Sequence, residues 1–178
     1  MSKTLYIVVP CYNEQEVLPE TAKRLLEKLQ SLVLKNKIAD NSRIMFVNDG
    51  SKDQTWSMIK RLCKESSVFA GVNLSRNRGH QNALLAGMAT AVKYADMIVT
   101  MDADLQDDVN VIPEMVDKYL AGCDIVYGVR NNRDTDSFFK RTSALAFYKL
   151  MHIMGVEIVY NHADYRLTSK NVLNYLEN

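Results

Sequence analysis

Several classes of protein are excluded by what this sequence lacks. It has only three cysteines in 178 residues. Cys11, Cys63 and Cys123 stand in no spacing typical of metal ligands, so we expect a reduced, cytosolic setting. No apolar run approaches the roughly 20 residues that span a bilayer. The formal net charge is only +1, which excludes the basic excess typical of nucleic-acid-binding proteins. The first apolar run, Thr4–Val9, begins almost at once, and we therefore expect no signal peptide.

What is present is the composition of a globular protein, with 47% hydrophobic and 24% charged residues. Short, β-rich apolar runs alternate with segments whose apolar residues repeat at helical spacing. The expected strands are Thr4–Val9, Arg43–Val47, Val68–Leu74, Met97–Met101 and Asp124–Tyr127. The expected helices lie within residues 19–33, 56–63, 83–91, 112–120 and 138–152. This alternation predicts an α/β protein with a mostly parallel sheet flanked by helices.

We expect residues 1–178 to form a single catalytic domain that is truncated at its C-terminus. No internal repeat, low-complexity segment or linker divides the chain. The last helical pattern, over residues 171–178, has little chain left to pack against.

Polar segments follow each of the five expected strands. They are residues 10–14, 48–51, 75–80, 102–108 and 128–133. In open parallel sheets, ligands bind at the carboxyl ends of the strands. Any one of these segments is compatible with an ordinary turn, but all five together predict one pocket at this edge of the sheet.

Two carboxylates, Asp102 and Asp104, stand two residues apart directly after the fourth strand. Carboxylates held together repel each other unless they are protonated or bridged by a cation. Hard cations such as Mg²⁺ and Mn²⁺ prefer oxygen ligands and bridge to phosphates, so we interpret the pair as a metal site rather than a surface acidic turn. Gln106 is either a further ligand or a turn residue. Asp107 and Asp108 are expected to cap the next helix.

Three residues at the same edge suit a nucleotide base. The Asp49 carboxylate can accept from the N–H of a uracil or guanine, or can form an Asx-turn. Tyr12 offers a flat ring for stacking, or packs as a core tyrosine. Glu14 either binds the base or caps the following helix.

Arginines near these loops offer guanidinium groups that match phosphate geometry. They are Arg76, Arg78, Arg130, Arg133 and Arg166. Singly, each is also compatible with a solvated surface position. His80 begins a helix, where the helix dipole disfavours its protonation.

Taken in order, the motifs resemble those of family 2 glycosyltransferases. They are VVPCYNE (8–14), VNDGSKDQT (47–55), LSRNRGHQNALLAG (74–87), MDADLQDD (101–108) and ADYRL (163–167). Within that family, the chain is most similar to dolichol-phosphate mannose synthases and bacterial undecaprenyl-phosphate sugar transferases. The last motif departs from the family in having Tyr165 where phenylalanine is usual.

The resemblance implies a GT-A fold, which is a Rossmann-like, mostly parallel sheet flanked by helices. It also implies a nucleotide-diphospho-sugar donor, Mg²⁺ or Mn²⁺ as cofactor, and inversion at the anomeric carbon. The nucleotide-sugar-binding residues would be Pro10, Tyr12, Glu14, Asp49, Ser51, Arg76, Asp102 and Ala103. Asp102, Asp104 and Gln106 would hold the metal, and Arg130, Arg133 and Arg166 would bind the acceptor. Asp104, Asp164 and Arg130 would be the catalytic residues.

We expect a UDP-sugar donor, with GDP-mannose as the alternative, and a polyprenyl-phosphate acceptor. The phosphate acceptor would need no general base, whereas a saccharide hydroxyl would need one, for which Asp164 is the candidate. The apolar residues of the helix over 136–154 either provide a track for the lipid or pack on further helices. The whole protein is expected to associate with the inner face of the cytoplasmic membrane, and a homo-oligomer is compatible with the sequence.

Three other functions share part of this pattern. A haloacid-dehalogenase-like phosphotransferase also has a DxD motif, but on its first strand, whereas here the motif follows the fourth. A nicotinamide-dependent dehydrogenase needs GxGxxG after a strand, which this sequence lacks. A non-catalytic binding domain of similar fold stays open.

Overall fold

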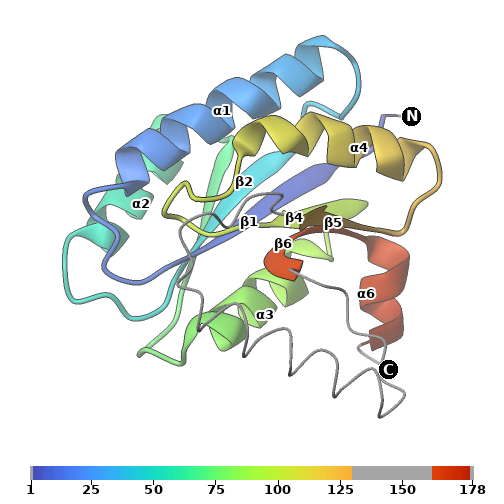
Figure 1. Cartoon of the computed structure of the whole chain (residues 1–178). Coiled ribbons are helices and arrows are strands. Elements are labelled where there is room, and N and C mark those ends of the chain that lie inside the picture. Colours follow the sequence, from blue (N-terminus) through green and yellow to red (C-terminus); the bar gives the residue numbers. More distant parts are fainter. Residues whose placement is uncertain (1, 130–161, 177–178) are drawn as a thin grey trace, which may run out of the picture. The chain divides into compact units, whose positions relative to one another are not determined.

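The computed structural model describes residues 2–129 and 162–176. The elements are β1 (Leu5–Cys11), α1 (Leu18–Leu34), β2 (Arg43–Asn48), α2 (Thr55–Glu65), β3 (Phe69–Asn73), α3 (His80–Ala91), β4 (Met97–Thr100), the 3₁₀ turn η1 (Val109–Val111), α4 (Ile112–Leu120), β5 (Ile125–Val129), β6 (His162–Ser169) and α6 (Lys170–Leu176) (Figure 1). All five strands expected from the apolar runs are present. The helix expected over 138–152 lies outside the described residues.

The sheet has the strand order β3-β2-β1-β4-β6-β5. Parallel pairing joins β1 to β2, β1 to β4 and β2 to β3. Strand β6 was not expected, and it runs antiparallel to β4, with Thr100 opposite Arg166. Its N-terminal end therefore lies at the carboxyl end of β4, where the polar loops gather.

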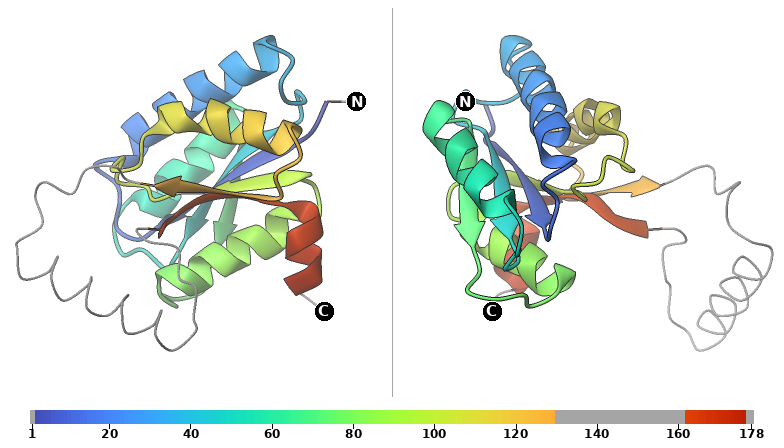
Figure 2. Two further views of the ribbon diagram at one scale, coloured as in Figure 1. Left: turned by 45° about the vertical axis from the view of Figure 1, so that its right-hand side comes forward. Right: turned by 90° about the vertical axis from the view of Figure 1, so that its left-hand side faces the viewer.

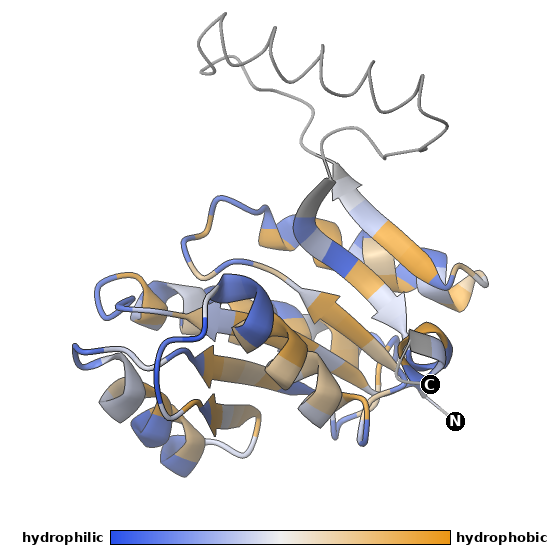
Figure 3. Cartoon of the chain, turned by 90° about the horizontal axis from the view of Figure 1, so that it is seen from below, coloured by the Kyte–Doolittle hydropathy of each residue, from blue (hydrophilic) through white to orange (hydrophobic). Residues whose placement is uncertain are grey.

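The two faces of the sheet are covered by different helices. Helix α3 packs closely on one face, because a Cβ on Gly87 would lie only 2.4 Å from Val8 and 2.7 Å from Val47. Helices α1, α2 and α4 cover the opposite face (Figure 2). Apolar residues run along the central strands between these layers (Figure 3). The buried sheet thus provides a rigid base from which the loops at its edge project.

By its internal contacts the chain divides into two compact units, Met1–Tyr127 with Asp164–Asn178, and Gly128–Ala163. Everything described below belongs to the first unit. Within the described ranges, no helix is both long enough and apolar enough to cross a membrane.

Candidate functional site

A pocket of about 300 Å³ opens at the carboxyl ends of β1, β2 and β4, beside the first turn of α3. It is lined by Pro10, Cys11, Tyr12, Glu14, Asp49, Asn77, Gly79, His80, Asp102, Ala103 and Asp104. The folded chain therefore brings residues from four polar loops to one place, as the positions of those loops after the strands predicted.

The loop after β2 organises the loop after β3. Asp49 is only 2% exposed, and its carboxylate accepts hydrogen bonds from the backbone N–H groups of Arg78 at 2.6 Å and Gly79 at 2.9 Å. Gly50 has a φ of +66°, and a Cβ there would lie 2.4 Å from the backbone nitrogen of Asn77. This close approach requires glycine, and it holds the loop after β3 against the pocket.

The loop after β1 is fastened to the residues that follow β2. Asn13, at a φ of 57°, donates from its backbone to Ser51 Oγ at 3.0 Å and accepts from the Lys52 backbone at 2.8 Å. These bonds fix the backbone next to Tyr12, whose ring is 40% exposed at the pocket. An exposed ring on a fixed backbone is suited to stacking on a planar ligand.

Glu14 belongs to the pocket and not to a helix cap, because α1 begins without a side-chain hydrogen bond at its N-terminus. Burial raises the pKa of Glu14, and the carboxylates of Asp104, Asp53 and Asp102 raise it further. This end of the pocket is therefore rich in negative charge.

The DxD loop after β4 is shaped by its own carboxylates. Asp104 Oδ1 accepts from the Gln106 backbone at 3.0 Å, and Leu105 between them has a φ of 60°. The Asp102 backbone donates to the buried Asp107 carboxylate at 3.3 Å. Asp108 caps the 3₁₀ turn η1 through the Asn110 backbone at 2.9 Å, whereas α4, the helix that Asp107 and Asp108 were expected to cap, begins without a side-chain cap.

Asp102 lies among several other acidic side chains. Burial raises its pKa, His80 lowers it, and Asp107, Asp104 and Asp164 raise it again. Among the described residues, its buried Oδ1 has no hydrogen-bond partner. His80 Nε2 approaches this oxygen at 3.4 Å without a hydrogen bond. A buried anionic oxygen without a hydrogen bond is costly, and a bound cation would stabilise it.

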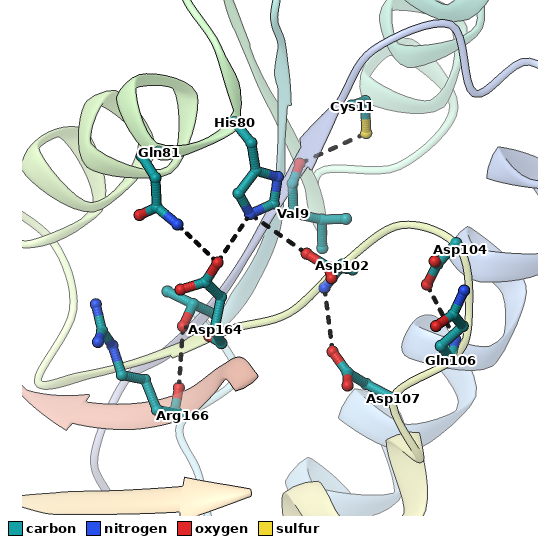
Figure 4. A network of polar contacts seen from close by, with 11 residues as sticks. Val9, Cys11, His80, Gln81, Asp102, Asp104, Gln106, Asp107, Asp164 and Arg166 are labelled. Carbon is teal, nitrogen blue, oxygen red and sulfur yellow. Dashed lines mark hydrogen bonds and ion pairs between the residues drawn. The ribbon is translucent and has the colours of Figure 1, made fainter. Parts of the chain in front are cut away.

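His80 links the DxD loop to β6 (Figure 4). Its Nε2 lies 3.4 Å from Asp102 Oδ1 and 3.3 Å from Asp164 Oδ2. Gln81 donates to the same Asp164 oxygen at 2.8 Å, and Thr100 Oγ1 donates to the Asp164 carbonyl. Contacts with residues of α3 and β4 thus hold Asp164 at the edge of the pocket.

Tyr165, which stands where the family usually has phenylalanine, uses its additional hydroxyl group in a hydrogen bond. It is 4% exposed, and its hydroxyl donates to the Asp108 carbonyl at 2.9 Å. Burial raises its pKa, and Asp107 and Asp108 raise it further. The extra hydroxyl therefore ties β6 to the end of the DxD loop.

A family profile described as Glycosyl transferase family 2 matches residues 6–176. The chain belongs to glycosyl transferase family 2. It is 50% identical over 173 residues to the "Uncharacterized glycosyltransferase YkoT" of Bacillus subtilis, covering 97% of this chain and 51% of that protein. It is 39% identical over 170 residues to the "Prophage bactoprenol glucosyl transferase homolog" of Escherichia coli, covering 94% and 52% respectively.

Among solved structures, the chain is similar to glucosyl-3-phosphoglycerate synthase from Mycobacterium tuberculosis, in complex with Mn²⁺, UDP and phosphoglyceric acid. The TM-score is 0.63 at 19% identity, over 96% of this chain and 57% of that one. This likeness and the observed sheet confirm the expected α/β, GT-A fold. The chain spans about half the length of the curated relatives that it matches.

Within this family 2 domain, most residues expected to bind the donor or the metal line one pocket. They are Pro10, Tyr12, Glu14, Asp49, Asp102, Ala103 and Asp104. Ser51, Arg76 and Gln106 are not among the lining residues, and Gln106 instead lines a separate hollow with Arg24. Arg130 and Arg133 lie outside the described residues.

A salt bridge to Arg166 would give Asp164 a purely structural role, and the described side chains do not form one. None of the ion pairs found within residues 2–129 and 162–176 joins these two residues, and Asp164 contacts His80 and Gln81 instead. His80, Asn77 and Gly79 also line the pocket, although none of them was assigned a binding or catalytic role from the sequence. The only signal for them was their place in the polar loop after the third strand.

Proposed function

We propose that the whole protein is an inverting glycosyltransferase that moves a sugar from a UDP-sugar to a polyprenyl phosphate. The observation that carries this is one pocket combining an exposed ring, Tyr12, and a buried carboxylate, Asp49, with the Asp102–Asp104 pair. That set offers a base platform at one end and a cation-binding end for the diphosphate. The names of relatives support the acceptor, including the "Bactoprenol glucosyl transferase" of Shigella phage SfV, 38% identical over 168 residues.

The donor would lie with its base against Tyr12 and its diphosphate toward the DxD loop. Asp49 already accepts two backbone hydrogen bonds, but each carboxylate oxygen has a further lone pair for a base N–H. In this orientation Asp49 both binds the base and holds the loop that borders it. GDP-mannose is the alternative donor, because guanine presents an N–H to the same carboxylate.

Asp102 and Asp104 fit a divalent cation. Asp102 Oδ1 is buried without a hydrogen bond among the described residues, and burial, together with the neighbouring carboxylates, raises the Asp102 pKa. No group of three or more acidic, histidine or cysteine side chains within the described residues forms a complete metal cluster, so diphosphate oxygens and water would complete the shell. The chemistry supplied by such an ion, Mg²⁺ or Mn²⁺, is positive charge beside the leaving diphosphate. For Gln106 to act as a further ligand, its side chain would have to turn toward the pocket from the hollow that it lines with Arg24.

Asp164 has a role that depends on the acceptor. A lipid phosphate is already anionic near neutral pH, so Asp164 would then position His80 and the sugar without taking a proton. A saccharide hydroxyl must lose its proton, and Asp164 would act as the general base. Arg130 and Arg133 are proposed to bind the acceptor phosphate, and the reaction would take place at the inner face of the cytoplasmic membrane.

The test is a transfer assay with the full-length protein and radiolabelled UDP-, GDP- and TDP-sugars. Undecaprenyl phosphate and a free saccharide are offered separately, with Mn²⁺ or EDTA, and release of inorganic phosphate is followed in parallel. We expect a labelled lipid product from a UDP-sugar and none in EDTA. Transfer to the saccharide alone would overturn the acceptor, and phosphate release without sugar transfer would overturn the glycosyltransferase function.

A further inference from the structure

A second cavity, the α3–α6 groove, lies on the face of the sheet that carries α3. Its volume is about 340 Å³, within the range of about 300–1,000 Å³ typical of ligand sites. Its lining is mostly apolar and includes Leu85 and Ala89 of α3, Tyr127 of β5 and Leu173 of α6. Leu85 is 57% exposed and Tyr127 is 38% exposed, so this apolar surface faces an open hollow.

The groove begins at the proposed reaction site. Gln81 and Leu85 are one helical turn apart on α3, a rise of about 6 Å, and share a face of the helix. Asp164 and Arg166 are two residues apart on β6, about 7 Å along one face of the strand. Gln81 donates to Asp164 at 2.8 Å. The face of α3 that carries Gln81 and Leu85 and the face of β6 that carries Asp164 and Arg166 therefore both start at this contact and lead away from the pocket.

Charge in the groove is confined to its end nearest the site. Of the residues that line it, Arg166 is the one with a charged side chain, and it follows directly after Asp164 on that face of β6. In Figure 4 the Arg166 side chain points away from the contacts between His80 and the two carboxylates. A cationic end beside the site and an apolar remainder match a molecule with an anionic head and a hydrocarbon tail.

We propose that the α3–α6 groove binds the first, phosphate-proximal units of the apolar tail of a polyprenyl-phosphate acceptor, with the phosphate toward Arg166. The assignment rests on the glycosyl transfer proposed above and adds where the lipid lies. A second copy of the chain would fill the apolar part of the groove equally well, but would leave unexplained why the single charged residue lies at the end next to Asp164.

The first experiment measures acceptor KM in the full-length protein, in detergent micelles of fixed composition. Leu85→Gln removes apolar contact without adding charge, and Leu120→Gln is the matched control, because Leu120 is 49% exposed at the end of α4. We expect Leu85→Gln to raise the KM for undecaprenyl phosphate about tenfold, the equivalent of most of a buried leucine side chain. The KM for the UDP-sugar should stay unchanged, and Leu120→Gln should leave both constants unaltered.

The second experiment needs no variant. A polyprenyl phosphate with a photoreactive group on its first isoprene units is cross-linked to the unaltered full-length protein, and the labelled peptides are identified. Labels on α3 and α6, lost in competition with undecaprenyl phosphate, would support the assignment. Labels only on other segments would overturn it, and this result does not depend on whether Leu85→Gln folds normally.

Three further outcomes separate the alternatives. An unchanged acceptor KM in Leu85→Gln, with transfer intact, would overturn the groove and leave the proposed function standing. A fall in molecular mass by light scattering, again without a change in KM, would assign the groove to a second copy of the chain. Absence of transfer to any polyprenyl phosphate by the unaltered protein, and absence of photolabelling, would overturn both the proposed function and the groove.

Discussion

Replacing Gly50 with alanine tests how the base-binding end of the pocket is built. The φ of +66° at Gly50 costs a residue with a side chain about 1–2 kcal/mol. The new Cβ would also lie 2.4 Å from the Asn77 nitrogen and 2.5 Å from the Arg76 carbonyl carbon. Because these atoms are backbone and cannot rotate away, overpacking adds about 1–3 kcal/mol. We expect Gly50→Ala to lower the free energy of unfolding by about 2–5 kcal/mol in all.

The matched control is Gly122→Ala, because Gly122 also has a positive φ, of +105°, but no atom lies within 4 Å of the position its Cβ would take. In urea unfolding, Gly50→Ala should lower the free energy of unfolding more than Gly122→Ala does, and the difference should equal the overpacking contribution of about 1–3 kcal/mol. Calorimetry with UDP should show weaker binding only for Gly50→Ala, since the displaced loop carries the amides that Asp49 binds. Equal losses of stability, or unaltered UDP affinity in Gly50→Ala, would refute this account of the loop.

Substitutions at three other positions test separate parts of the pocket. Asp104→Asn should reduce transfer about 10³-fold and weaken Mn²⁺ binding measured by calorimetry, whereas full activity in EDTA would contradict a metal role. Asp49→Ala should weaken UDP binding by about 1–3 kcal/mol, and unchanged affinity for both UDP and GDP would exclude Asp49 from base binding. His80→Ala should lower kcat while sparing the KM of the donor, because His80 bridges Asp102 and Asp164, and His80→Gln should recover part of the loss. A donor KM that rises in parallel in both His80 variants would assign His80 to donor binding instead.

Apolar runs predicted β1, β2 and β4 because these central strands are buried on both faces, as in β1, where every residue from Leu5 to Cys11 is buried. The edge strands β3 and β5 also have apolar runs, although several of their residues are exposed. Strand β6 was missed for the opposite reason. Its buried residues Tyr165 and Leu167 alternate with Asp164 and Arg166, which belong to the site and the groove. These two charged residues interrupt the apolar run from which a strand could have been predicted.

The same contrast holds within the site. Tyr12, Asp49 and Asp102 were predictable, because each directly follows a strand and the carboxyl ends of parallel strands meet at one edge. His80 was not, because its contact with Asp164 depends on β6 pairing beside β4, and residues 80 and 164 are far apart in the sequence. Local pattern indicates which residues reach the edge, but only the strand order decides which of them touch.

Strand β6 also explains how the two halves of the site are held in register. On one face of the strand, the Tyr165 hydroxyl bonds to the Asp108 carbonyl at the end of the DxD loop. On the other face, Asp164 meets Gln81 and His80 at the start of α3. Since consecutive residues of a strand point to opposite faces, any movement of the DxD loop that displaces Tyr165 must also displace Asp164. The position of the carboxylate nearest the proposed acceptor groove is therefore tied to that of the loop proposed to hold the diphosphate.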